Sequence, residues 1–395
     1  MILTEKQQEG LKIAVARYKN HEPYTCVSGF AGSGKSTLIK FIIEALDLEE
    51  SEVAYVAYTG KAASVLRHKG CANAMTAHKL LYFSKRLPNG KFVYRPKPSL
   101  DPWLKVVVVD EVSMLPKQLW DLLMQHKVYV LACGDPYQLP PIYKNQDNEV
   151  LEHPHIFLDE IMRQAKESEI IRLTMDIREG KSPVYSQGKE VHIVRPNEVV
   201  DGMLTWADQI ITGTNKKRAD INQYMRDAAG RGISPEVGDK VICLRNCWDI
   251  VDNSGENALI NGATGILTNF TRAELRYPIA TGNLYQKGIT ALKSEITTDA
   301  GEVFSDVYVD YLALTKYKKS LTPEQEYQIY RNEQLRGTEP IEFNYGYAIT
   351  CHRAQGSQWD KVLVYEEKFP FDKLEHSRWL YTACTRAAQK LVLVK

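Results

Sequence analysis

One stretch near the start of the chain has the residues to bind the phosphates of a nucleotide. Residues 29–36 read Gly-Phe-Ala-Gly-Ser-Gly-Lys-Ser and fit the phosphate-loop pattern GxxxxGK[ST] at every fixed position. The backbone N–H groups of such a loop point at phosphate oxygens, Lys35 would reach the β- and γ-phosphates, and the Ser36 hydroxyl would ligate Mg²⁺. The residues expected to bind ATP here are Gly29, Gly32, Ser33, Gly34, Lys35, Ser36 and Thr37.

The flanks of this loop decide between a phosphate site and a glycine-rich turn that only joins two elements. Residues 24–27 read as a short buried strand, and residues 37–46 have the apolar spacing of a helix. A strand, a glycine turn and a helix in this order are the context that the phosphate loop requires. The flanks therefore favour the phosphate site.

Two carboxylates follow a second apolar run. Residues 105–109 are Lys-Val-Val-Val-Val, typical of a strand buried on both faces of a parallel sheet, and Asp110 and Glu111 come next. Asp110 would hold Mg²⁺, and Glu111 would orient and deprotonate the attacking water. An isolated acidic pair often only caps a helix. Together with a phosphate loop on the same predicted sheet, the catalytic interpretation is favoured.

Two glutamines are further candidates for the nucleotide site. The apolar strand 128–133 ends near Gln138, which is placed to sense a γ-phosphate. Gln7 follows Thr4 at the spacing of a capping box, so one interpretation is that Gln7 only caps the first helix. In the other account its amide donates to and accepts from the edge of adenine.

Three small-residue or basic turns are suited to the phosphates of a nucleic-acid strand. Thr59 and Lys61 follow the predicted strand 53–57, and a plain strand-to-helix turn would not explain the lysine. Thr214 follows the strand beginning at Ile210 and opens a basic turn, although a helix with a solvated basic face is the competing interpretation. His78 lies in a third turn, and a lone histidine is usually structural.

Residues 82–103 interrupt the alternation of strands and helices. They contain two short β-like runs around Asn89-Gly90, the strongest short signal for a hairpin. Phe92 and Tyr94 share one face of the second run because side chains alternate along a strand. A hairpin this small must project from a larger domain, either as a wedge against a duplex or as decoration.

Length and composition set the broad class. The chain has 395 residues, 44% of them hydrophobic and 25% charged, which predicts two or more domains. Lys+Arg 50 against Asp+Glu 49 gives no overall basic signature, so any nucleic-acid path must come from local patches. Seven cysteines without a CxxC pair, and no apolar run of the roughly 20 residues that cross a bilayer, predict a soluble, cytoplasmic protein without structural zinc.

The combined motifs resemble those of superfamily 1 DNA helicases, most closely the branch containing RecD and the phage helicase Dda. GFAGSGKS, AYTGKAA, VVVVDEVSM and GDPYQLPP look like motifs I, Ia, II and III of that family. Arg163-Gln164 is similar to motif IV, residues 347–357 to motif V, and residues 381–387 to motif VI. All seven motifs occur in the family's order.

The resemblance implies an α/β fold with two RecA-like P-loop NTPase domains. The first would span residues 1–155, with the hairpin insertion at about 82–103, and the second would combine 156–235 with 343–395. A change to short β-type runs, including an expected hairpin around Asn261-Gly262, predicts an SH3-like β insertion over 236–342. The segment 324–337 is polar and helical, with no assigned role.

The resemblance also implies which residues act from the second domain. Arg163 and Arg386 would reach the γ-phosphate across a cleft, with Gln355 and Gly356 in the same nucleotide site. The expected DNA contacts are Thr59, Lys61, His78, Phe92, Tyr94, Thr214, Asn215, Thr350 and His352.

The expected function is ATP- and Mg²⁺-dependent movement on single-stranded DNA, with unwinding of tailed or forked duplex. The resemblance implies five-prime to three-prime polarity, a monomer, and possible replication or recombination proteins as partners. Two alternatives share these motifs: a translocase that does not separate duplexes, and a nucleotide-switched nucleic-acid-binding module. Polarity, a preference for DNA over RNA, step size and oligomeric state are not readable from the residues alone.

Overall fold

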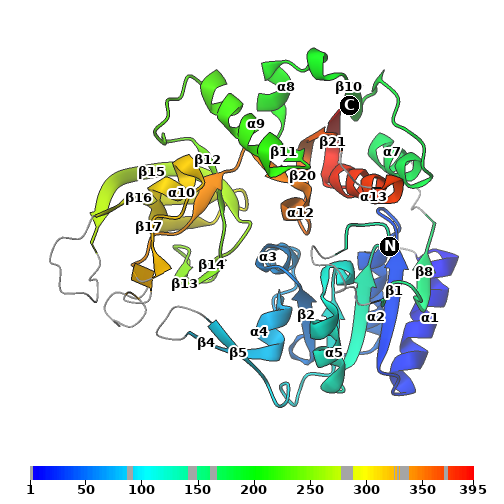
Figure 1. Ribbon diagram of the computed structural model, residues 1–395. Helices are drawn as coiled ribbons and strands as arrows, with labels where there is room; N and C mark the ends of the chain where they lie inside the picture. Colours follow the sequence, from blue (N-terminus) through cyan, green and yellow to red (C-terminus); the bar gives the residue numbers. More distant parts are fainter. Residues whose placement is uncertain are drawn as a thin grey trace. The chain divides into compact units, whose positions relative to one another are not determined.

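The structure of the protein is a computed structural model. It describes residues 3–86, 92–140, 149–160, 167–276, 288–323, 325–326, 329, 338–368 and 372–395. The chain forms two compact units. The first comprises Met1–Leu81, Lys97–Asn215 and Thr350–Lys395, and the second comprises Tyr82–Pro96 and Lys216–Ile349. Figure 1 labels many of the helices and strands of both units. Among the described residues, no helix combines the length and apolar character needed to span a membrane.

The first unit contains a six-stranded sheet in the order β3-β2-β6-β7-β1-β8, in which all neighbouring strands pair in parallel. Its strands are β1 (Tyr24–Gly29), β2 (Val53–Ala57), β3 (Met75–Thr76), β6 (Val106–Val109), β7 (Tyr129–Gly134) and β8 (Ile156–Leu158). Its helices are α1 (Glu5–Lys19), α2 (Lys35–Ala45), α3 (Gly60–His68), α4 (Ala77–Leu81) and α5 (Lys117–Gln125). The sheet takes in β8, which the sequence analysis assigned to the second domain.

The inner strands of this sheet are apolar because helices cover them. Every residue of β6 and β7 is buried. Helices α1 and α2 pack against β1, and the apolar face of α2 buries Leu38, Ile39 and Ile42. Continuous apolar runs of this kind are expected for central strands of a parallel sheet, since both faces exclude water.

The first unit also holds most of a second six-stranded sheet, in the order β19-β11-β20-β21-β10-β9. Its strands are β9 (Ser186–Gln187), β10 (Val191–Val194), β11 (Gln209–Thr212), β19 (Ala348–Thr350), β20 (Trp359–Tyr365) and β21 (Ala387–Val394). Its helices are α7 (Glu169–Arg178), α8 (Asp201–Trp206), α12 (Cys351–Ala354) and α13 (Lys373–Cys384). Strands β11, β20, β21 and β10 pair in parallel, whereas β9 is antiparallel to β10.

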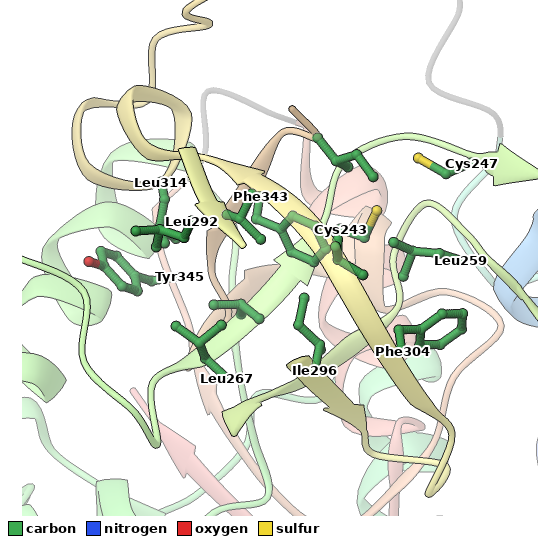
Figure 2. Close-up of a cluster of buried hydrophobic side chains, with 14 residues drawn as sticks. Cys243, Cys247, Leu259, Leu267, Leu292, Ile296, Phe304, Leu314, Phe343 and Tyr345 are labelled. Atoms are coloured by element: carbon green, nitrogen blue, oxygen red, sulfur yellow. The ribbon is translucent and has the colours of Figure 1, made fainter. Parts of the chain in front are cut away.

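The second unit is built around an antiparallel five-stranded sheet in the order β17-β16-β15-β12-β18. Its strands are β12 (Lys240–Cys243), β15 (Thr264–Leu275), β16 (Ile289–Thr298), β17 (Val303–Asp310) and β18 (Phe343–Tyr345), beside the short pair β13 (Cys247–Val251) and β14 (Ala258–Leu259). Helix α9 (Asn215–Ala228) precedes these strands in the sequence, and α10 (Tyr311–Lys316) lies between β17 and β18. Figure 2 shows its core side chains, with Phe304, Leu292 and Phe343 fully buried or nearly so.

Two details differ from the expected β insertion. Strand β18 lies just beyond the expected end at residue 342, and its pairing with β12 makes it part of the same sheet. The expected hairpin around Asn261-Gly262 is wrong, because β14 pairs with β13 whereas β15 pairs with β12 and β16. The turn instead leads the chain back along β12, where the Gly262 N–H donates to the Cys243 carbonyl oxygen at 2.9 Å.

The hairpin expected within residues 82–103 is present as β4 (Tyr82–Arg86) and β5 (Phe92–Pro96), which pair antiparallel. Its Asn89-Gly90 turn and the Phe92 side chain lie outside the described part. Tyr94 is opposite Ser84 and Phe83 is opposite Arg95, so Tyr94 and Phe83 point to opposite faces. Tyr94 is 47% exposed and packs edge-on against Tyr82.

A buried ionic network in the second unit ties α9 to the antiparallel sheet. Asp239 is fully buried, and its carboxylate accepts hydrogen bonds from Arg226 Nε at 3.1 Å, Arg231 Nη1 at 2.7 Å and the Tyr347 hydroxyl at 2.9 Å. The Glu236 N–H donates to its second oxygen. Removing one partner of a buried ion pair is strongly destabilising, because the other charge stays buried without a partner.

We predict that Asp239→Ala destabilises the second unit by about 3–5 kcal/mol, because Arg226 would remain buried without its carboxylate. The measurement is the urea midpoint followed by circular dichroism. Lys293→Ala is the control, since it breaks the Lys293–Asp306 pair, whose side chains are 43% and 76% exposed. Equal midpoints for the two variants would contradict a stabilising role for this network.

Candidate ATP site and nucleic-acid contacts

The phosphate loop connects β1 to α2 through backbone angles and a close approach that favour glycine. Gly34 immediately precedes α2 with φ 81° and ψ 25°, in the left-handed region. A Cβ on Gly29 would lie 2.7 Å from the Leu158 carbonyl oxygen and from Ser33 Oγ, so β8 approaches too closely for any side chain. These constraints bend the chain so that the loop's N–H groups can face an anion.

Lys35 lies against the loop that it would serve. Its ammonium donates to the carbonyl oxygens of Gly29 at 2.7 Å and Phe30 at 3.0 Å. The charge is therefore held at the loop, where it can exchange these carbonyls for phosphate oxygens. Ser36 follows as the second residue of α2, at the helix end whose dipole favours negative charge.

The two candidate carboxylates stand at the carboxyl end of β6. Burial, followed by the nearby Glu111 charge, raises the pKa of Asp110 to about 6, and Lys35 opposes that rise. Glu111 has φ 51°, an uncommon value for a residue with a side chain, and such conformations cluster at functional sites. Carboxylate and hydroxyl oxygens are hard ligands, so Asp110 and Ser36 are chemically suited to Mg²⁺.

The raised pKa of Asp110 would make the binding of a cation to its carboxylate dependent on pH. Its pKa of about 6 lies above the ordinary 3.8, so protons compete with a cation at this oxygen as the pH falls through 6. The ionised form is also the costly one in the folded state. Without a bound cation, the contribution of Asp110 to the free energy of unfolding therefore decreases as the pH rises from about 4 to 6.

The loop after β7 is held by a hydrogen bond of its own and by two with helix α13. The Tyr137 N–H donates to Asp135 Oδ1 at 3.0 Å, and the Tyr381 hydroxyl donates to Asp135 Oδ2 at 2.6 Å. Leu139 N–H donates to Thr382 Oγ1 at 3.0 Å. Gln138 is buried within this loop, and its γ-phosphate role stays a prediction.

Gln7 is buried, and the capping box at the start of α1 is present. Its side-chain oxygen accepts from the Thr4 N–H, and its amide nitrogen donates to the Gly34 carbonyl oxygen at 3.3 Å. The second bond ties α1 to the phosphate loop, a contact that the sequence did not reveal. The adenine role stays a prediction.

The residues proposed from the second sheet are tightly held. Arg386 is buried, with its fork donating to the Thr382 and Ser357 carbonyl oxygens and to Thr385 Oγ1. Gln355 donates to the Leu139 carbonyl oxygen at 2.9 Å. A Cβ on Gly356 would lie 2.7 Å from Ala62 Cβ, so this turn touches the first turn of α3. Arg163 lies outside the described residues.

Several expected DNA contacts have structural partners. Thr59 caps α3, with its hydroxyl oxygen accepting from the Ala62 N–H at 3.1 Å. The Lys61 ammonium lies 4.9 Å from the centre of the Trp359 ring. Burial lowers the pKa of His78 and of His352, which favours neutral rings. Thr350 is buried where α12 begins. Their DNA roles stay predictions.

An acidic side chain occupies the turn expected to bind a DNA phosphate. Glu367 Oε2 accepts from the Gly213 N–H at 2.6 Å and the Thr214 N–H at 2.9 Å, while Oε1 accepts from the Thr214 hydroxyl at 2.7 Å. This turn leads into α9, whose first residue is Asn215. The donors suit an anion, and in this structure the anion is Glu367.

Sequence reasoning missed three contributors to this region. Arg178 places its guanidinium carbon 3.5 Å from the centre of the Phe30 ring in the phosphate loop. Tyr381 bonds both that loop and Asp135, and Glu367 fills the turn before α9. Only the tyrosine had a sequence signal, its place in the resemblance to motif VI.

The fold and the geometry define a P-loop NTPase in which two largely parallel sheets contribute to one region. Two family profiles match: an AAA domain over residues 3–197 and a UvrD-like helicase C-terminal domain over residues 345–394. Both matches confirm the resemblance to superfamily 1 helicases of the RecD and Dda branch, which the chain resembles in its first and in its last part.

Curated relatives agree with that placement. The chain is 26% identical over 387 residues to the ATP-dependent RecD2 DNA helicase of Deinococcus radiodurans, covering 92% of this chain and 46% of that protein. It is 26% identical over 189 residues to the ATP-dependent DNA helicase Dda of Enterobacteria phage T4, covering 45% and 43% respectively. Each alignment therefore covers less than half the length of the relative.

Solved structures support the fold. A Bacteroides Pif1 helicase in complex with ADP-AlF3 and single-stranded DNA aligns with a TM-score of 0.55 at 18% identity. A structure of two coordinating Pif1 helicases at forked duplex DNA aligns with a TM-score of 0.58 at 19% identity. Each alignment covers 100% of this chain and 92% of the other.

We predict that Glu111→Gln lowers ATP turnover by at least about 10²-fold, because the amide cannot accept the water proton, while ATP·Mg²⁺ binding is preserved. Single-turnover hydrolysis and equilibrium nucleotide binding measure the two effects. Asp110→Asn is the comparison, since it should instead raise the Mg²⁺ concentration needed for turnover. Near-normal hydrolysis by Glu111→Gln would refute the role assignment.

We predict that Glu367→Gln tightens single-stranded DNA binding about three- to fivefold at low salt. A charge at a helix N-terminus is worth up to about 1 kcal/mol, and the neutral amide competes less well with a phosphate. Fluorescence anisotropy measures the affinity. Glu375→Gln, an equal charge change at an exposed position of α13, is the control. Unchanged affinity for Glu367→Gln would show that this turn does not receive a phosphate.

Proposed function

We propose that this chain is an ATP-driven helicase motor that moves five-prime to three-prime on single-stranded DNA and unwinds tailed or forked duplex. The observation that carries the proposal is that α13, the helix between β20 and β21 of the second sheet, contacts the phosphate loop of the first sheet, where the Ala31 N–H donates to the Tyr381 hydroxyl. Nucleotide binding and release at such a site can change the spacing of two domains. The helicase names of the relatives support DNA as the track.

In the proposed mechanism, the first sheet supplies most of the ATP chemistry. Lys35 contacts the β- and γ-phosphates, Gln138 senses the γ-phosphate and Glu111 takes the proton of the attacking water. Mg²⁺, held by Ser36 and Asp110, would neutralise phosphate charge. Gln7 would read the adenine edge.

The second sheet would supply the arginines. Arg386, and Arg163 from the expected motif IV, would stabilise charge on the γ-phosphate, to which a planar guanidinium fork is matched. Arg386 now donates to Ser357 and Thr385, so reaching a phosphate requires exchange of at least one of these bonds. Gln355 and Gly356 would shape the same site from the turn that touches α3.

The proposed DNA path consists of hydroxyl, imidazole and basic groups. It comprises Thr59, Lys61, His78, Thr214, Asn215, Thr350 and His352. We further propose that the five-stranded antiparallel sheet is an SH3-like insertion, and that the β4–β5 hairpin is the wedge. The motor would work as a cytoplasmic monomer, with replication or recombination proteins as possible partners.

The test of this function uses two duplexes with opposite single-stranded tails. We expect single-stranded DNA to stimulate ATP hydrolysis strongly and the five-prime-tailed duplex alone to be unwound. Lys35→Ala, which lacks the phosphate-contacting ammonium, is the inactive control. Strong stimulation without unwinding would favour the translocase, and weak stimulation would favour the nucleotide-switched binding module.

The wedge is tested with Phe92→Ala combined with Tyr94→Ala. Separating each stacked pair costs about 1.4 kcal/mol, and an aromatic face can replace part of the lost stacking. We expect slower unwinding with nearly unchanged DNA-stimulated ATP hydrolysis. Phe83→Ala is the matched control, because Phe83 is 59% exposed but points to the opposite hairpin face. Equal unwinding by both variants would remove the wedge role from this face.

A further inference from the structure

The Tyr381 hydroxyl joins the phosphate loop to the loop that follows β7. The side chain comes from α13 and is 1% exposed. Its oxygen accepts from the Ala31 N–H at 3.0 Å and donates to Asp135 Oδ2 at 2.6 Å. One buried hydroxyl therefore touches backbone from the phosphate loop and a carboxylate at the end of the neighbouring strand.

The direction of these bonds is determined by the groups involved. A backbone N–H can only donate, so the tyrosine oxygen accepts from Ala31 and its own proton goes to Asp135. The other oxygen of Asp135 accepts from the Tyr137 N–H. The carboxylate is buried, and both of its oxygens are satisfied by donors. Removal of the tyrosine proton would leave one of them without this partner.

The Asp135 loop carries the position proposed to sense the γ-phosphate. Gln138 N–H donates to the Asp135 carbonyl oxygen at 3.3 Å, which closes the turn between them. Helix α13 grips the same loop at a second point, since Thr382 Oγ1 accepts from the Leu139 N–H. Arg386 lies two residues after the end of this helix. Tyr381 thus belongs to the element that precedes the proposed arginine finger.

We propose that Tyr381 is a positioning residue for ATP hydrolysis. Its hydroxyl fixes the position of α13 relative to both the phosphate loop and the Gln138 turn. The inference rests on the proposed ATP-driven function. It assigns Tyr381 no contact with the nucleotide. The residue acts through the placement of Gln138 and Arg386 around the γ-phosphate, so its loss should impair turnover more than nucleotide binding.

A purely structural role is the competing account, and a second buried tyrosine provides the comparison. Tyr129 lies on β7 with its hydroxyl bonded to Thr25 Oγ1 at 2.6 Å and donating to the Ala14 carbonyl oxygen at 3.2 Å. It is 7% exposed. Tyr129→Phe therefore also removes two buried hydrogen bonds, but from a place that contacts neither loop.

The experiment compares Tyr381→Phe with wild type and Tyr129→Phe in the full chain. The phenylalanine keeps the ring packed against Tyr137, whose centroid lies 5.3 Å away. We expect DNA-stimulated kcat to fall about tenfold, the scale of losing a hydrogen bond to a charged group, with the KM for ATP within about twofold. Tyr129→Phe should keep the wild-type kcat, and thermal unfolding measures the stability loss in each variant.

A double substitution separates positioning from general weakening. If Tyr381 acts through the Gln138 turn, Tyr381→Phe combined with Gln138→Ala should lose little more kcat than Gln138→Ala alone. Wild-type kcat in Tyr381→Phe, equal kcat losses in the two tyrosine variants, or fully additive losses in the double variant would overturn the inference. A wild type without ATP hydrolysis would overturn the proposed function and the inference with it.

Discussion

The parallel pairing of β1 with β7 is the constraint on which the candidate ATP site depends. Val27 is level with Cys133 and Ser28 with Gly134, so the phosphate loop and the Asp135 loop leave the sheet side by side. Strand β6 pairs with the other side of β7, and Asp110 follows β6 at the same edge of the sheet. Because all of these strands run in one direction, their carboxyl ends meet along one edge, where open α/β sheets bind ligands. The chemistry of each loop is local, but its proximity to the others comes from the register of the strands.

This edge brings together charged groups that are costly to bury. Asp110 and Asp135 are both buried enough for the pKa of each carboxyl to rise, and the positive charge of Lys35 opposes the rise in both. Strain is present as well, since Glu111 has a left-handed backbone. A cation bound beside Asp110 would relieve part of the electrostatic cost. Such a site is less stable than an apolar edge would be, and ligand binding recovers some of that difference.

The sequence predicted the elements with strong local signals and missed those that depend on distant pairing. The buried runs 53–57 and 105–109, the phosphate loop and the capping box at Thr4 have their patterns within a few residues. The expected hairpin at Asn261-Gly262 was wrong. A turn signal shows where the chain reverses but does not specify which strands then pair with each other. The contact of Glu367 with Thr214 spans 153 residues, and that of Tyr381 with Ala31 spans 350. No periodicity reports contacts at such separations, so the sequence could name candidate residues but not their partners.

The separation of these partners also bears on how the site can respond to its ligands. A contact within one loop changes only that loop, whereas the hydrogen bond between α13 and the phosphate loop connects two elements that carry different parts of the proposed chemistry. Arg386 donates hydrogen bonds to the carbonyl oxygens of Thr382 and Ser357, so a displacement of these residues would carry the arginine with them. Displacement of α13 relative to the phosphate loop would then shift the arginine and the Gln138 turn together. That shared movement is what coupling nucleotide chemistry to a change in domain spacing requires, since an allosteric link needs an element that both sites can bias.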